Sequence, residues 1–202
     1  MKKARIAVFV SGGGTNLQAL IDAEKSGVIK SGEIVLVLSS SESAYALERA
    51  KQNRIATCVV SRKASKDQAD FESGILAALE EAGVDLIVLA GFMSILSESF
   101  TARFPKRILN VHPSLIPSFC GKGYYGLRVH EEALRYGVKV TGATVHFVNE
   151  IPDGGEIIMQ KAVAIREGDT PEKLQKRVMR LAEWKILPAA TEQVCASIIA
   201  TN

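Results

Sequence analysis

The chain has 202 residues, of which 47% are hydrophobic and 23% are charged, and its formal net charge is +3. These values are typical of a globular protein with a substantial core, and no apolar run approaches the roughly 20 residues of a membrane helix. Lysines and arginines alternate with acids instead of forming a basic block, so neither a membrane nor a nucleic acid is an expected partner.

The amino-terminal stretch "MKKARIAVFVSGGG" has the basic and then apolar order of a signal peptide. Its apolar run ends at Ser11 without a small-residue cleavage site, so we interpret residues 5–10 as a first strand. The three cysteines are far apart and lack CxxC spacing, which argues against a disulfide framework or a zinc site. A reducing, cytoplasmic location is the expectation.

Short apolar runs continue along the chain at residues 33–39, 56–60, 85–90 and 107–112. Amphipathic helical patterns lie between most of them, at 16–27, 44–53 and 70–83, and each ends at or near Gly or Asn. Nearly continuous apolar strands alternating with helices predict an α/β fold. We expect a Rossmann-like, mostly parallel twisted sheet with helices on both faces.

The pattern changes after residue 112. An irregular segment, "PSLIPSFCGKGYYG", precedes a helical pattern at 127–137 and two strand-like runs at 139–148 and 156–165. A final helix is predicted to begin near Pro171, with Asp169 or Thr170 as its cap. With no internal repeat or linker, we expect residues 1–202 to form a single domain.

The segment "SGGGTN", residues 11–16, joins the first strand to the first helical pattern. Backbone N–H groups at such a helix start form an anion site, to which Gly13, Gly14, Thr15 and Asn16 can contribute. The dinucleotide fingerprint fails because Leu17 replaces its third glycine and no acid ends the second strand. A small phosphate monoester is the favoured ligand; a tight turn without a ligand is the alternative.

Asn110 and His112 end the fifth apolar run, two residues apart and therefore on one face of a strand. An amide donor beside an imidazole can polarise a carbonyl and move a proton. Asp153, in "IPDGG", can reach the same edge, although an ordinary Asp-Gly turn explains it equally well. Among the other histidines, we expect His130 to be solvated and His146 to be packed or to support a neighbour.

Several motifs occur together in a familiar order: "SGGGTNLQALIDA", "LAGFMSILS", "NVHPSLIPSF", "GLRVHEEAL", "TGATVHFV" and "DGG". Over about residues 5–190 the chain resembles the phosphoribosylglycinamide formyltransferase family. The resemblance implies the formyltransferase fold, with a phosphate-binding half at about 1–105, a folate-binding and catalytic half at about 106–190, and a carboxyl-terminal helix. It also implies formyl transfer from the co-substrate 10-formyltetrahydrofolate to the amine of glycinamide ribonucleotide, without a metal.

The resemblance also implies a role for individual residues. Asn110, His112 and Asp153 correspond to the catalytic residues, and the glycine loop corresponds to the phosphate site. Glu183 is similar to an acid that approaches the substrate amine, and Lys66 is a weak match for a basic residue at the phosphate. The folate is expected on two segments, represented by Met93, Ser94, Ile95 and Leu96 and by Val148, Asn149, Glu150 and Ile151.

The chain departs from this family pattern at several places. Ser94 stands where many relatives carry Arg, which removes a charge contact to the donor, and Trp184 replaces a customary His. The last helix is one residue longer before Glu183, and one residue rotates a helix face by about 100°.

We expect a monomer or a homodimer. A formyltetrahydrofolate hydrolase and a non-catalytic phosphate-binding module are the alternative functions.

Overall fold

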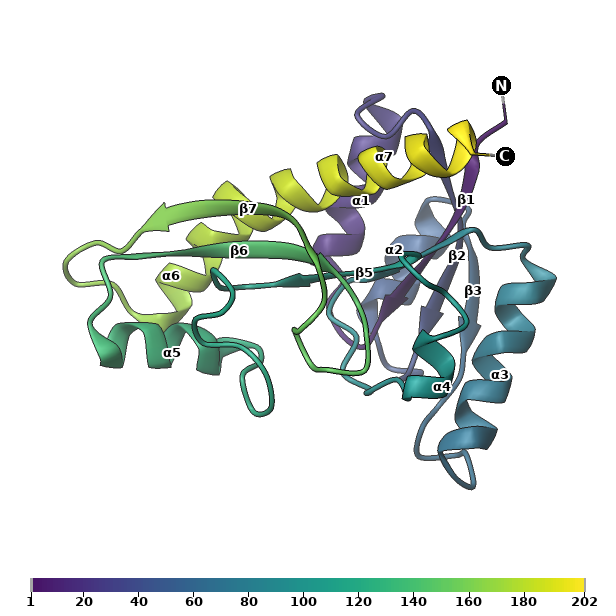
Figure 1. Ribbon diagram of the computed structural model, residues 1–202, viewed down its shortest axis with the longest axis horizontal. Coiled ribbons are helices and arrows are strands. Elements are labelled where there is room, and N and C mark those ends of the chain that lie inside the picture. Colours follow the sequence, from purple (N-terminus) through teal and green to yellow (C-terminus); the bar gives the residue numbers. More distant parts are fainter. Residues whose placement is uncertain (1, 202) are drawn as a thin grey trace.

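The computed structural model describes residues 2–201. Its centre is a seven-stranded sheet in the order β3-β2-β1-β4-β5-β6-β7 (Figure 1). Five strands run parallel: β1 (Ala4–Val10), β2 (Gly32–Ser39), β3 (Ala56–Val59), β4 (Leu86–Leu89) and β5 (Ile108–His112). Two antiparallel strands, β6 (Val140–Phe147) and β7 (Ile157–Ala164), extend the sheet beyond β5. The predicted mostly parallel α/β sheet is confirmed.

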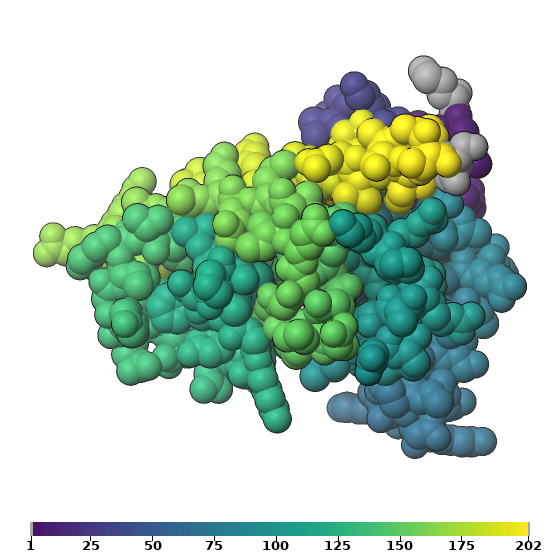
Figure 2. Space-filling model, in the orientation of Figure 1, coloured from purple at the N-terminus to yellow at the C-terminus, as the bar shows by residue number. Residues whose placement is uncertain are grey.

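Helices cover both faces of the sheet, because successive side chains of a strand point to opposite faces. In β1, Ile6, Val8 and Val10 join one apolar cluster, which includes residues of α1 (Thr15–Lys25), α2 (Tyr45–Gln52) and α7 (Trp184–Ala200). Ala7 and Phe9 join a second cluster with α3 (Gln68–Glu81) and α4 (Glu98–Thr101). Figure 2 shows α7, in yellow, against the segment that follows α1.

The carboxyl-terminal helical region begins as the sequence indicates. Thr170 caps α6 (Pro171–Val178) by accepting a hydrogen bond from the Lys173 N–H, so Thr170 and not Asp169 is the cap. Asp169 instead accepts two hydrogen bonds from the Arg177 guanidinium. A π turn, η1 (Met179–Glu183), separates α6 from α7. This turn accommodates an additional residue within an otherwise helical run.

His130 lies in α5 (Leu127–Tyr136), where we expected it to be solvated, and that prediction is wrong. The side chain is fully buried, and neither ring nitrogen has a hydrogen-bond partner within the described chain. Burial lowers its pKa to about 4, and the charge of His112 acts in the same direction. The reason is helical spacing: His130 shares the buried stripe of Val129 and Ala133, although two glutamates follow it in sequence.

The long helices follow the lengths of their apolar patterns. Within residues 2–201, none combines the length and the apolar character needed to cross a membrane. Because β1 to β5 are parallel, their carboxyl ends lie at one edge of the sheet, which is where an open α/β sheet binds its ligands. The glycine loop follows β1 at this edge, and Asn110 and His112 lie at the end of β5.

Candidate active site

Two hydrogen bonds from α2 hold the glycine loop, residues 11–16, in place. The Gly12 carbonyl accepts a hydrogen bond from the Ala46 N–H at 3.0 Å, and the Gly13 carbonyl accepts one from Arg49 Nε at 2.8 Å. Gly14 precedes α1 in the left-handed conformation, at φ 72°, and a Cβ there would lie 2.7 Å from Ala46 Cβ. A glycine is therefore required at position 14, because a side chain there would be both strained and in collision with α2.

Ser11 joins the glycine loop to the segment that follows β4. Its hydroxyl oxygen accepts a hydrogen bond from the Met93 N–H at 2.9 Å and lies 2.7 Å from the hydroxyl of Ser40. The residues expected to hold folate are divided by exposure: Met93 and Ile95 are 57% and 76% exposed, whereas Leu96 belongs to the core. The glycine loop and the segment Met93–Leu96 are therefore neighbours at this edge of the sheet.

Asn110, His112 and Asp153 converge with His146, which sequence analysis assigned only a packing or supporting role. Asn110 faces His146 across the β5–β6 pair, with 3.2 Å between Asn110 Nδ2 and His146 Nε2. Asn110 Nδ2 is also 3.5 Å from Asp153 Oδ1, and His112 Nδ1 is 3.4 Å from Asp153 Oδ2. The amide therefore has a second N–H that is only weakly engaged, and this N–H is available to a ligand oxygen.

His112 is 4% exposed and has a partner at each ring nitrogen. Nε2 lies 2.9 Å from the Phe119 carbonyl oxygen, so this nitrogen carries a hydrogen, and Nδ1 faces Asp153. Burial lowers the pKa of His112, while Asp153 and the Phe119 carbonyl oppose that shift. The result is a buried imidazole with a donor at Nε2 and a carboxylate behind it.

Asp153 reaches the cluster because of the glycines that follow it. Asp153 itself has a left-handed φ of 57°, and a Cβ at Gly155 would lie 1.8 Å from the Phe147 carbonyl oxygen. Its Oδ2 accepts a hydrogen bond from the Gly121 N–H at 2.8 Å. Burial opposes ionisation, but the contacts with His146, His112 and Gly121 outweigh it and lower the pKa of Asp153. The carboxyl group is therefore anionic at neutral pH.

Glu183 connects the π turn to the glycine loop. Its Oε2 accepts a hydrogen bond from Asn16 Nδ2 at 2.8 Å, and the residue is only 6% exposed. Burial raises the pKa of Glu183 to about 7, opposed by the hydrogen bond from Asn16. The π turn ends at Glu183, whose carboxylate is directed at Asn16 of α1.

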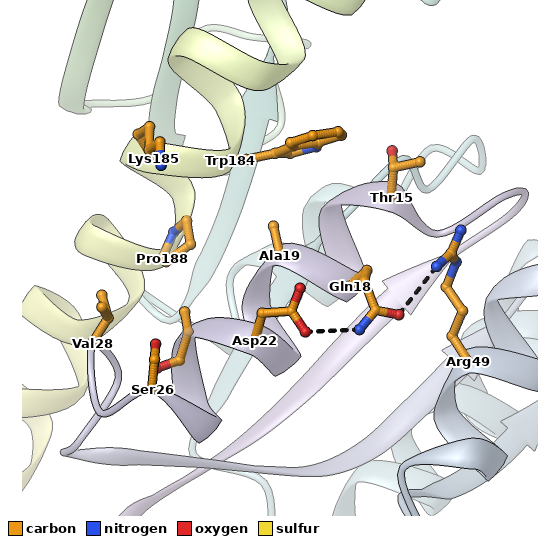
Figure 3. A pocket seen from close by; sticks show the side chains of 11 residues that line it. Thr15, Gln18, Ala19, Asp22, Ser26, Val28, Arg49, Trp184, Lys185 and Pro188 are labelled. Atoms are coloured by element: carbon orange, nitrogen blue, oxygen red, sulfur yellow. Dashed lines mark hydrogen bonds between the residues drawn. The ribbon is translucent and has the colours of Figure 1, made fainter.

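A cavity of about 540 Å³ lies between α1 and α7 and is shown in Figure 3. Thr15, Gln18, Ala19 and Asp22 line it along α1, with Trp184 opposite them. Thr15 is the one residue that it shares with Gly13–Asn16, and none of Asn110, His112 and Asp153 lines it. This cavity is therefore separate from the Asn110–His112–Asp153 cluster.

The remaining expected site residues lie in the loop that leads to Asp153 and in the segment before α3. Val148, Asn149 and Glu150 line a hollow of about 330 Å³ beside α4, and Ile151 is exposed. Lys66 precedes α3, where its N–H donates to Asp70, and within residues 2–201 no side-chain hydrogen bond or ion pair joins it to the glycine loop. In the same part of the chain, no group of three His, Cys, Asp or Glu residues is arranged to hold a metal ion.

Two partners in the cluster escaped sequence reasoning. The Phe119 carbonyl and the Gly121 N–H both come from the irregular segment after β5. They act through backbone atoms, so no residue type marks them in the sequence. Only the irregular, Pro- and Gly-punctuated character of the segment after β5 pointed to this region.

Comparisons with known proteins agree with this geometry. A sequence profile of the formyl transferase family matches residues 4–191. The human trifunctional purine biosynthetic protein adenosine-3 is 46% identical over 198 residues, which are 98% of this chain but only 19% of that protein. Phosphoribosylglycinamide formyltransferase of Haemophilus influenzae is 45% identical over 93% of this chain and 84% of its own length. The crystal structure of glycinamide ribonucleotide transformylase 1 from Symbiobacterium toebii superposes with a TM-score of 0.90 at 40% identity, over 96% of this chain and 89% of that one.

Proposed function

Because this chain belongs to the formyl transferase family, we propose that it transfers the formyl group of 10-formyltetrahydrofolate to the amine of N1-(5-phospho-D-ribosyl)glycinamide, a step of purine biosynthesis. The observation that carries the proposal is the convergence of Asn110, His112 and Asp153 at the carboxyl end of β5. The glycine loop, at the carboxyl end of β1 on the same edge, provides a place for the phosphate of the acceptor.

The acceptor is proposed to lie between the glycine loop and Glu183. The N–H groups at the start of α1, with the side chains of Thr15 and Asn16, bind its phosphate, because a helix start carries partial positive charge. Asn16 is also the hydrogen-bond donor to Glu183, so the loop and the carboxylate are positioned together. Glu183, with a pKa near 7, can accept a hydrogen bond from the amine.

The amine nitrogen attacks the formyl carbon, and the carbonyl oxygen becomes an oxyanion. The weakly engaged N–H of Asn110 and the Nε2–H of His112 donate to this oxygen. To do so, His112 exchanges the Phe119 carbonyl for the oxyanion as its acceptor. Asp153, which is ionised beside Nδ1 of His112, takes the proton that the amine loses.

Collapse of the tetrahedral centre breaks the bond between the formyl carbon and N10 of the folate. N10 takes up a proton as it leaves, so the net change is a formyl group on the amine and a hydrogen on N10. The site also has to align the amine with the formyl carbon, and such alignment can supply a large part of the rate. We propose that Met93–Leu96 and Val148–Ile151 provide this alignment by binding the folate, and that residues 1–202 act as one domain.

The proposed function is tested by following loss of a 10-formyl folate in a spectrophotometer, with and without the ribonucleotide. Loss only when the ribonucleotide is present is the expected result. Loss at the same rate without it would identify a hydrolase, which delivers the formyl group to water. No loss under either condition, with the protein folded, would leave a binding module and overturn the proposal.

A further inference from the structure

One row of side chains crosses the last three strands of the sheet, which lie side by side in Figure 1. His112 of β5 is paired with Thr144 of β6, and Thr144 is paired with Gln160 of β7. Side chains of directly paired residues point to the same face of a sheet, so an imidazole, a hydroxyl and an amide stand in line. The proposed mechanism uses only the imidazole.

Thr144 is fully buried, and its hydroxyl group uses all of its hydrogen-bonding capacity. The hydroxyl donates to the Ser114 carbonyl oxygen at 2.7 Å and accepts from the Ile116 N–H at 3.1 Å. Its other acceptor position is taken by Gln160 Nε2, at 3.0 Å. Because a hydroxyl has one donor and two acceptor positions, these three partners fix its orientation completely.

Gln160 completes the attachment from the edge of the sheet. Its Nε2 also donates to the Ile116 carbonyl oxygen at 3.0 Å, so both amide hydrogens are used. Ile116 is thus held at its N–H by Thr144 and at its carbonyl by Gln160. The Gln160 side chain is exposed on an edge strand, so a substitution there leaves the apolar core intact.

The attached segment leads directly to two backbone groups of the candidate active site. Three residues after Ile116, the Phe119 carbonyl oxygen lies 2.9 Å from His112 Nε2. Two residues further on, the Gly121 N–H donates to Asp153 at 2.8 Å. An irregular surface segment of this kind is mobile unless other groups bind it. Holding Ile116 therefore restricts where the Phe119 carbonyl and the Gly121 N–H lie.

We propose that Gln160 is a positioning residue for formyl transfer. It acts through Thr144 on the segment 114–121. That segment in turn orients His112 and Asp153, so Gln160 affects the transfer step without touching the substrates. The proposal rests on the proposed function. Binding of the ribonucleotide, which is assigned to the glycine loop after β1, should not depend on Gln160.

The test measures single-turnover formyl transfer, with both substrates saturating, in the wild type and in the Gln160→Met variant. Methionine has a side chain of similar length but cannot donate a hydrogen bond. Loss of the two hydrogen bonds should slow transfer by about 5- to 30-fold and change Kd for the ribonucleotide by less than about 2-fold. Amide hydrogen exchange should become faster in residues 114–121 and remain unchanged in the rest of the chain.

Two further variants separate hydrogen bonding from other effects. Lys161→Met is the matched control, because it changes the next residue of β7, whose side chain points to the other face of the sheet. Within residues 2–201 the Lys161 side chain forms no hydrogen bond or ion pair, so this control should transfer at the wild-type rate. Gln160→Lys keeps a donor for the same two oxygens and should transfer faster than Gln160→Met.

Three results would overturn the positioning role. The first is transfer by Gln160→Met at the wild-type rate. The second is an equal loss in Lys161→Met, since any change in the edge strand would then have the same effect. The third is equal slow transfer by Gln160→Met and Gln160→Lys, because hydrogen-bond donation would then not be what Gln160 contributes. Absence of transfer by the wild type would instead refute the proposed function.

Discussion

Single residues in the candidate active site owe their chemistry to burial and to a small number of partners. Asp153 and Glu183 are both carboxylic acids in poorly exposed positions, yet their pKa values shift in opposite directions. Asp153 has two imidazoles and a backbone N–H around it, whereas Glu183 has only the amide of Asn16. One carboxyl group is thereby kept ionised and the other titrates near neutrality.

The raised pKa of Glu183 predicts a pH dependence of stability. The folded protein holds this proton more tightly than the unfolded chain, so the free energy of unfolding falls as pH rises from 4.5 to about 7. The expected loss is on the order of 3 kcal/mol, from a shift of roughly 2.5 pKa units. The Glu183→Gln variant should lack this loss, and urea unfolding of both proteins at pH 5 and pH 8 measures it. Parallel losses in the two proteins would show that Glu183 is not the titrating group.

At the scale of elements, turns decide which side chains meet. The alternation of side chains in β5 made it possible to predict that Asn110 and His112 share a face. The approach of Asp153 to Asn110 and His112 could be predicted only as one alternative, beside an ordinary Asp-Gly turn. It depends on the β6–β7 hairpin and on the left-handed conformation of Asp153 itself. His130 was wrongly predicted because its charged neighbours concealed a buried helical stripe. The Phe119 and Gly121 contacts were out of reach, since backbone partners carry no residue signature.

Substitutions at two neighbouring glycines test separately the structural role and the binding role of the loop before α1. Gly14→Ala places a Cβ at a positive φ and against Ala46, so it should reduce the free energy of unfolding by about 1–3 kcal/mol. Gly13→Ala meets nothing within 4 Å and should leave stability close to that of the wild type. If this loop binds phosphate, Gly13→Ala should nevertheless raise KM for the ribonucleotide, because its side chain obstructs the approach of the anion. Thermal unfolding and steady-state kinetics distinguish these effects; an unchanged KM would remove Gly13 from the phosphate site.

At the scale of the whole molecule, the carboxyl-terminal region closes onto the amino-terminal half. The π turn brings Glu183 to Asn16, and further along α7 the Glu192 carboxylate binds residues between α1 and β2. It accepts hydrogen bonds from the N–H groups of Lys30 and Ser31, at 2.9 Å each, and from the Ser31 hydroxyl at 2.8 Å. Contacts across some 160 residues of sequence give no local pattern, and so the sequence predicted the helix but not where it attaches.

Glu192→Ala should therefore lower stability without altering chemistry. Three donors would lose a charged acceptor, which predicts a loss of about 1–3 kcal/mol in the free energy of unfolding. Glu192 is remote from Asn110, His112 and Asp153, so kcat should be retained at temperatures where the variant is folded. Denaturant unfolding together with initial rates measures both quantities. Unchanged stability, or a fall in kcat with the variant folded, would contradict this account of the α7 attachment.

The proposed mechanism depends on Asp153 acting as an anion beside His112. The most direct measurement is single-turnover formyl transfer by the Asp153→Asn variant, which keeps the size of the side chain and an acceptor for the Gly121 N–H but removes the charge. We expect the transfer rate to fall by roughly 10² to 10⁴, with binding of the ribonucleotide retained. A folded variant that transfers the formyl group at close to the wild-type rate would contradict it.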